Sequence, residues 1–168
     1  MDPAALMDRE GRSAPSSRRR ARELGLTLIE LLIVIALLGI IAAIVVPAVY
    51  QQLERIKVRR AIADLVLIEF AVERYEDEND SLPESFDDLA QAPRIDPWGR
   101  AYVYFKFGGP GWRGRARKDR FLVPINSTFD LYSIGRDGDS RPPLQNPKSF
   151  DDIVRANDGA FYGLGRDF

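Results

Sequence analysis

The sequence predicts an α+β protein, in which a long N-terminal helix precedes a small head with an antiparallel sheet. The stretch from Leu26 to Tyr50 is apolar apart from Thr27 and Glu30, and a bilayer-spanning helix needs about 20 such residues. A helical repeat of apolar residues continues beyond this stretch. Residues 81–168 contain turn residues and short aromatic and β-branched runs, which are typical of strands.

The segment 1–25 is a basic leader in front of the apolar stretch. Its arginines are Arg9, Arg12, Arg18, Arg19, Arg20 and Arg22. By the positive-inside rule the leader stays in the cytoplasm and the residues after the span lie across the membrane. A second basic set follows the span and weakens this prediction without reversing it: Arg55, Lys57, Arg59 and Arg60.

Glu30 places a carboxylate near the beginning of the apolar stretch. An acid in the hydrocarbon region costs roughly 2.5–3.5 kcal/mol on insertion scales and is normally paired. No basic side chain lies between Leu26 and Tyr50. We therefore expect the partner of Glu30 to come from a cut end of the chain or from another copy.

The helical pattern continues past the membrane segment as an amphipathic half-helix. Its apolar stripe consists of Val58, Ile62, Leu65, Ile68, Val72 and Tyr75. The turn residues of Asn79–Pro83 end it, and one helix from Leu26 to Asn79 would be about 80 Å long. Pro47 lies inside this helix and removes a backbone hydrogen bond, so we expect a kink or a melted turn there.

In the head, Ser85 and Asp88 form a helix-start pattern, which predicts a short helix over Phe86–Gln91. Asp96–Gly99 is typical of a type I turn. Strands are predicted at 101–107, 121–125 and 129–134, an exposed loop at 108–118, an irregular polar segment at 135–148, and a docked C-terminal segment at 161–164.

The chain has no Cys and no His. This composition excludes disulfides and Cys- or His-based zinc sites, and no catalytic constellation appears, so we expect a protein that is not an enzyme. A hard cation bound by oxygen atoms is compatible with the sequence. Asp137, Asp151 and Asp152, with backbone carbonyls near Ile134 and Arg136, are candidate ligands, although aspartates in surface loops are more often solvated turn formers.

The string Gly25-Leu-Thr-Leu-Ile-Glu30 resembles the processing site of type IV prepilins and of the pseudopilins of type II secretion. The resemblance implies that a membrane peptidase cleaves between Gly25 and Leu26 and N-methylates Leu26. It also makes Glu30 the glutamate of the family motif. Leu26 departs from the phenylalanine that the family usually has at this position.

The head resembles that of the major pseudopilin of type II secretion. The resemblance is carried by Asp96–Gly99 with the Tyr102–Tyr104 strand, by Phe129–Gly138 and by Asp151–Ile153. The family binds one calcium ion in this loop, and the matching ligands here are Asp137, Asp151, Asp152 and the carbonyl of Ile134. Two segments, 139–150 and 108–128, are longer than the family leads us to expect.

The resemblance implies a type IV pilin-like fold and a structural function. The expected parts are a cleaved leader (1–25), a transmembrane half-helix (26–50), an amphipathic half-helix (51–80) and a periplasmic head (81–168). Anchored in the inner membrane, the subunit would polymerise into a helical filament that helps push folded proteins through the outer membrane. Its expected partners are further copies of itself, minor pseudopilins, the prepilin peptidase and the inner-membrane secretion platform.

Two other functions remain open from the sequence. One is a type IV pilin of a surface fibre for adhesion, motility or DNA uptake, and the other is a monomeric, signal-anchored periplasmic binding domain. The arginine-rich segment 112–120 could contact nucleic acid phosphates. Because the formal net charge of the chain is −1, we expect this segment to be a solvated or subunit-contact surface and nucleic acid binding to be absent.

Overall fold

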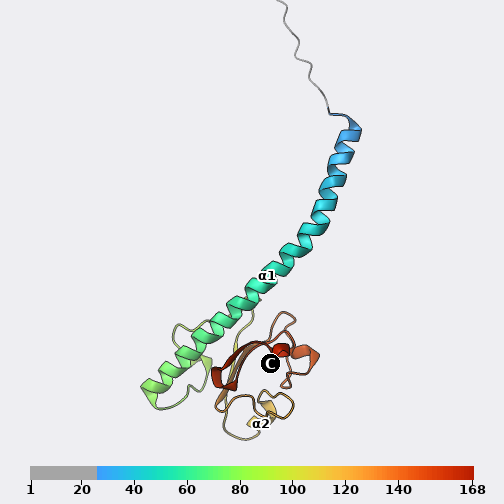
Figure 1. Ribbon diagram of the computed structural model, residues 1–168. Helices are drawn as coiled ribbons and strands as arrows, with labels where there is room; N and C mark the ends of the chain where they lie inside the picture. The colour runs from blue at the N-terminus through green and yellow to red at the C-terminus, as the bar shows by residue number, and fades with distance from the viewer. Residues whose placement is uncertain (1–25) are drawn as a thin grey trace, which may run out of the picture. The chain divides into compact units, whose positions relative to one another are not determined.

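The computed structural model describes residues 26–168, so the predicted leader and Gly25 lie outside the described residues. The described chain divides into two units, the first ending at Ala43 and the second spanning Ile44–Phe168. The first unit contributes the N-terminal part of helix α1 (Leu28–Asn79), and the second contains the rest of α1 and the head (Figure 1).

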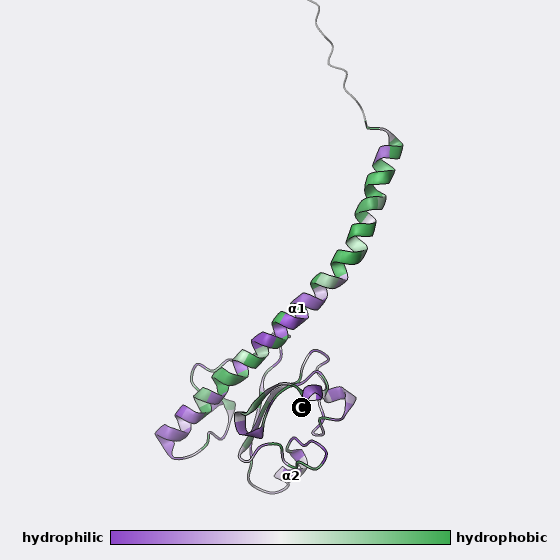
Figure 2. Ribbon diagram, viewed as in Figure 1, coloured by the Kyte–Doolittle hydropathy of each residue, from purple (hydrophilic) through white to green (hydrophobic). Residues whose placement is uncertain are grey.

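The N-terminal part of α1 is apolar on all sides. Its side chains are exposed in the single chain, including Leu31, Ile35 and Leu38. In the part of the chain that the structure describes, α1 is the one helix long and apolar enough to cross a membrane (Figure 2). Such a surface needs lipid or other protein to cover it.

Helix α1 continues through Pro47 without interruption, so of the two predicted alternatives the melted turn is wrong and the kink stays a prediction. A proline removes one backbone hydrogen bond, and the neighbouring bonds of a 52-residue helix hold the segment together. The predicted end of the helix is confirmed. Asn79 Nδ2 donates to the Tyr75 carbonyl at 2.8 Å, and Asp80 adopts a left-handed conformation with φ 52°.

The sheet of the head has four antiparallel strands in the order β1 (Val103–Lys106), β2 (Phe129–Ser133), β3 (Ile153–Ala156) and β4 (Phe161–Leu164). Tyr104 pairs with Leu131, and Val154 pairs with Gly163. Each strand is thus followed along the sheet by the next strand in the chain, which makes the sheet a simple meander.

The two faces of the sheet are covered by different elements (Figure 1). On the first face, β1, β2 and β3 pack against the predicted stripe of α1. This core comprises Ala61, Leu65, Ile68, Val72, Leu89, Tyr102, Phe129, Leu131 and Ile153. On the second face the covering residues come from loops, and that core comprises Ile125, Leu144, Val154 and Ala156. Successive residues of β3 therefore serve opposite faces, as the period of a strand requires.

Polar contacts also join α1 to the head. Tyr102 donates its hydroxyl to Asp64 at 2.8 Å, and Trp98 Nε1 donates to Glu54 at 3.1 Å. The turn at Asp96 is confirmed by the hydrogen bond from Gly99 N to the Asp96 carbonyl at 2.9 Å. These contacts come from residues beyond the apolar stripe and fix the register of the helix against the head.

Several predicted elements of the head need correction. The Ser85–Asp88 capping box is present, but its helix is a 3₁₀ turn, η1 (Phe86–Asp88), shorter than predicted. The strand predicted at 121–125 is wrong, since Phe121 is fully exposed and the segment forms no strand. Pro124 lacks the N–H that a strand ladder needs. Strand β3 was missed, and 161–164 is a strand of the sheet.

The predicted exposed loop is also only partly correct. Residues 108–118 include a short helix, α2 (Trp112–Arg115), and the chain then turns inward so that Ala116 and Arg117 are buried. A further 3₁₀ turn, η2 (Pro147–Ser149), interrupts the polar segment before β3. Both loops thus contribute to the second face of the sheet.

We predict that Leu65→Ala destabilises the head by about 2–5 kcal/mol, because it leaves a cavity between α1 and the sheet. Leu65 is 0% exposed, whereas Leu67 on the same helix is 56% exposed. Leu67→Ala is therefore the matched control, with an expected effect within about 0.5 kcal/mol. Urea unfolding of the detergent-solubilised protein, followed by tryptophan fluorescence, measures both. Equal losses would contradict the assigned packing.

Candidate functional site

The first candidate site is the start of α1, where Leu26 and Thr27 precede the helix. Thr27 N and Thr27 Oγ1 each donate to Glu30 Oε2 at 2.8 Å, and Glu30 N donates to Thr27 Oγ1 at 3.3 Å. This arrangement is a capping box. The sequence analysis missed this contribution of Thr27, although Thr-x-x-Glu before an apolar run is a recognised signal.

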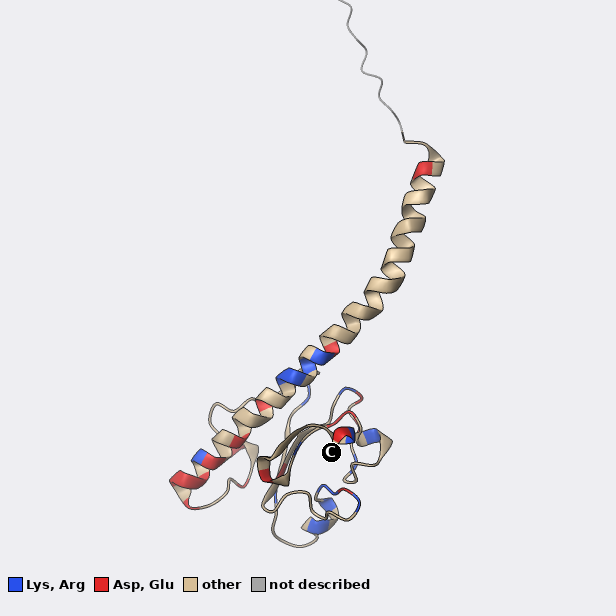
Figure 3. Cartoon of the chain, in the orientation of Figure 1, with Lys and Arg blue, Asp and Glu red and all other residues tan. Residues whose placement is uncertain are grey.

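Glu30 has no charged partner among the residues that the structure describes. Of the ion pairs formed among residues 26–168, none includes Glu30. Glu30 is the acidic residue of the first turn of α1, and Figure 3 shows that the helix after this turn continues as a long uncharged stretch. The capping box holds the carboxylate beside the backbone N–H of Thr27, one residue from the predicted cleavage point. A positive group that reached this end of the helix would therefore meet an oriented acid.

The second candidate site is the loop that connects β2 to β3. Gly135, with φ +68°, begins it, and a Cβ at this position would lie 2.3 Å from the Asp151 carbonyl oxygen. Arg100 donates to the Gly135 carbonyl at 2.8 Å, and Gly135 N donates to Ser133 Oγ at 3.1 Å. The start of the loop is thus fixed against its end and against the turn that precedes β1.

Of the three aspartates predicted as calcium ligands, Asp137 and Asp151 lie together and Asp152 lies apart from them. Asp137 N donates to Asp151 Oδ2 at 2.9 Å, while Asp137 Oδ1 accepts from Asp139 N at 2.8 Å. Asp152 is 0% exposed and directs its carboxylate into a different network. Ile134 lies between β2 and Gly135, at the start of the loop.

The predicted ligands therefore do not fit a shared calcium ion in this arrangement. Within residues 26–168, no three acidic side chains form a group that could hold a metal ion. Asp137 and Asp151 each accept a hydrogen bond from a backbone N–H of the loop with one carboxylate oxygen. Calcium binding stays a prediction from the sequence.

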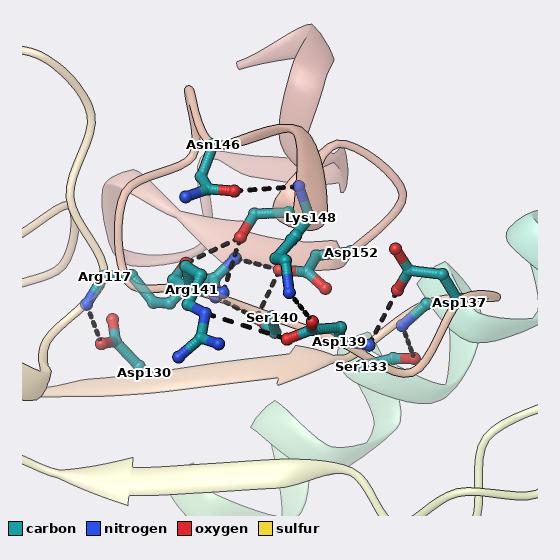
Figure 4. Close-up of polar contacts among 12 residues, drawn as sticks. Arg117, Asp130, Ser133, Asp137, Asp139, Ser140, Arg141, Asn146, Lys148 and Asp152 are labelled. Carbon is teal, nitrogen blue, oxygen red and sulfur yellow. Dashed lines mark hydrogen bonds and ion pairs between the residues drawn. The ribbon is translucent and has the colours of Figure 1, made fainter.

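The carboxylate of Asp152 is bound by Arg117 (Figure 4). Arg117 Nη2 lies 2.5 Å from Asp152 Oδ2, and Arg117 Nη1 donates to Ser140 Oγ at 2.6 Å and to the Arg141 carbonyl at 3.0 Å. Ser140 Oγ in turn donates to Asp152 Oδ2 at 2.6 Å. The guanidinium also lies 4.4 Å from the centre of the Tyr132 ring.

Burial shapes the electrostatics of this network. It raises the pKa of the Asp152 carboxyl, and the Arg117 guanidinium opposes that rise. Burial likewise raises the pKa of Asp130, which accepts from Arg117 N at 2.6 Å and from Asn126 at 2.9 Å. The sequence analysis missed Arg117, because nothing in the sequence distinguishes it from the neighbouring Arg113 and Arg115.

A second buried ion pair lies on the helix side of the sheet. Arg155 Nε of β3 lies 2.7 Å from Glu69 Oε1 of α1, and Arg155 Nη1 donates to Asn126 Oδ1 at 3.1 Å. The Arg155 guanidinium also covers the Phe129 ring at 4.2 Å. This pair was not predicted, because Glu69 sits among charges that the helical pattern assigns to the solvent face.

The apolar helix with its Thr27–Glu30 capping box, followed by a four-stranded antiparallel head, defines a type IV pilin-like subunit. The model of the prokaryotic N-terminal methylation motif matches residues 20–46. Type II secretion system core protein G of Pseudomonas aeruginosa is 31% identical over 141 residues, which cover 71% of this chain and 88% of that protein.

Other relatives carry the same name. The core protein G of Klebsiella pneumoniae is 32% identical over 139 residues, covering 79% of this chain and 93% of that protein, and that of Escherichia coli K12 is 27% identical over 143 residues, covering 73% and 88%. No solved structure gives a significant match. The chain belongs to the family of type II secretion system core protein G, the major pseudopilins, and the predicted resemblance is confirmed.

We predict that Gly135→Ala destabilises the head by about 2–4 kcal/mol, because a Cβ both strains the left-handed backbone and collides with Asp151. Gly109 has a similar φ of +75° with nothing within 4 Å of its Cβ position, so Gly109→Ala should cost only about 1–2 kcal/mol. Urea unfolding of both variants isolates the cost of the close approach. A Gly135→Ala protein no less stable than the control would show that the loop does not close against Asp151.

Proposed function

We propose that this protein is the structural subunit of a type II secretion pseudopilus, a helical filament that helps push folded proteins through the outer membrane. The observation that carries the proposal is the similarity to core protein G, which extends over most of this chain and of its relatives. The filament would consist of copies of this chain, together with minor pseudopilins and the inner-membrane secretion platform.

Before assembly, the subunit would be anchored in the inner membrane with its head in the periplasm. The apolar part of α1 supplies the anchor. The prepilin peptidase would cleave between Gly25 and Leu26 and methylate the new N-terminus, and the match to the methylation motif over residues 20–46 supports this step.

Assembly has a physical basis in the first part of α1. Its apolar side chains are exposed on all sides in the single chain, so packing against copies of α1 would cover them as lipid does. Cleavage would create an amine at Leu26 in the same apolar surroundings as Glu30. Pairing that amine with the Glu30 of a neighbouring subunit would remove two uncompensated charges and fix the register between subunits.

The role is mechanical. The chain has no His or Cys, and the acids of the two candidate sites and of the buried ion pairs serve a helix cap, a turn and the fold of the head. Together with the membership of the core protein G family, this supports a subunit that transmits movement and performs no chemistry.

We predict that Glu30→Gln is cleaved normally but assembles poorly. Glutamine still completes a capping box, so this substitution removes the charge while it keeps the helix start. The control is Thr27→Val, which removes the capping hydroxyl and keeps the charge, and which should still assemble. Mass spectrometry reports cleavage and methylation, and electron microscopy of sheared filaments reports assembly. Normal filaments from Glu30→Gln would exclude the pairing role.

We further predict that deletion of this protein leaves folded exoproteins in the periplasm and that expression of the intact chain restores their release. Secretion is measured by the distribution of an exoprotein between periplasm and medium. If the deletion leaves secretion unchanged and removes long surface fibres, the proposal is overturned in favour of a type IV pilin.

A further inference from the structure

The buried carboxylate of Asp152 poses an electrostatic problem, because an ionised acid away from water needs a cation or a set of donors. Asp152 is 0% exposed and lies immediately before β3, where the long loop from β2 returns to the sheet. Whatever binds Asp152 therefore decides whether this loop is closed.

We infer that the cation that closes this loop is the guanidinium of Arg117, and that the head keeps its fold without calcium. The guanidinium binds a carboxylate oxygen of Asp152, the hydroxyl of Ser140 and the carbonyl of Arg141. The carboxylate and the backbone carbonyl are oxygen types that a calcium ion takes from a loop. Ser140 and Arg141 come from the start of the loop and Asp152 from its end, so one planar donor joins the two.

Arg117 is held in place from several sides. Its N–H donates to Asp130 Oδ2 at 2.6 Å, and its carbonyl accepts from Ile125 N at 3.0 Å. The next residue, Lys118, donates its N–H to the Pro142 carbonyl at 3.0 Å and accepts from Leu144 N at 2.9 Å. These backbone hydrogen bonds join the two loops beside the ion pair and hold the backbone of Arg117 in place.

Two long loops build this network. Segment 108–128 supplies Arg117, and segment 139–150 supplies Ser140 and Arg141. The first loop thus delivers a side-chain cation to the buried aspartate, and the second loop wraps around that cation.

A calcium ion at the same place would have to compete with the guanidinium. Asp152 Oδ2 already accepts from Arg117 and Ser140. Asp152 Oδ1 is buried without a hydrogen-bond partner among the described residues, but one oxygen is far fewer than the six to eight that calcium takes. Asp137 and Asp151 are engaged with the loop backbone instead.

The first test uses the full-length chain purified in detergent, with its melting temperature followed by tryptophan fluorescence. Both tryptophans, Trp98 and Trp112, lie in the head and so report its unfolding. We expect the same melting temperature with calcium chloride and with a calcium chelator. A fall with chelator that added calcium reverses would overturn the inference.

The second test is a double-mutant cycle of Arg117→Met, Asp152→Asn and their combination. Each single change should lower the melting temperature by about 10 °C or more, because it leaves a buried group without its partner. The double variant should lose clearly less than the sum. Arg113→Met, an exposed arginine of the same loop, is the control and should change the melting temperature by less than about 2 °C.

Additive losses in this cycle would show that Arg117 and Asp152 do not act as a pair and would overturn the inference. If a variant does not fold, the comparison of the unmodified chain with and without calcium still decides the question. Both measurements concern the stability of the head, so their failure would leave the proposed function in secretion untouched.

Discussion

The head depends on covering both faces of one four-stranded sheet in a chain without disulfides. Helix α1 covers the first face with a stripe of fully buried residues such as Leu65 and Ile68, which is the usual solution for an α+β unit. The second face has no helix of comparable length among the described residues and is covered by loops. A loop brings polar backbone groups into contact with the sheet, and each of those groups needs a partner. The backbone bonds around Lys118 and the hydrogen bond from the Arg117 guanidinium to the Arg141 carbonyl supply such partners.

Each face of the sheet thus has one buried ion pair at its covering layer. The Glu69–Arg155 pair joins α1 to β3. The Arg117–Asp152 pair joins segment 108–128 to Asp152, the residue that precedes β3. Buried pairs return little net stability once desolvation is counted, but loss of one partner is costly because it leaves a buried charge. Their contribution here is to specify one arrangement of the layers, since an apolar contact alone tolerates sliding. Strand β3 lies between β2 and β4 and has covering layers on both faces, which explains why every residue of it is buried.

The sequence was sufficient to predict those elements that have one strong local pattern. The apolar length of α1, its buried stripe, its end at Asn79 and strand β2 all follow from periodicity and turn residues. The sequence was insufficient where contacts between distant parts of the chain determine whether a segment forms a strand. Strand β3 was missed because it is only four residues long, follows the acidic Asp152 and contains the charged Arg155; both charges are tolerated there because each has a partner from a distant part of the chain. Segment 121–125 has strand-like composition, yet Phe121 is exposed and Pro124 interrupts the ladder. For the candidate site, the motif around Glu30 was visible from local spacing, whereas the inward turn at Arg117 has no local signal.

The charges of the chain therefore separate into two kinds. Asp152 and Glu69 are buried acids whose basic partners lie in the same chain, and they serve the fold of the head. Glu30 stands in the apolar part of α1 and has only the hydrogen bonds of Thr27 among the described residues. Glu30 is exposed in the single chain and forms no ion pair among residues 26–168, so a positive charge for it would come from outside the described residues. In the pseudopilus proposed above, the amine of another processed subunit would supply this charge, so an electrostatic requirement like the one that closes the head would also drive the subunits together.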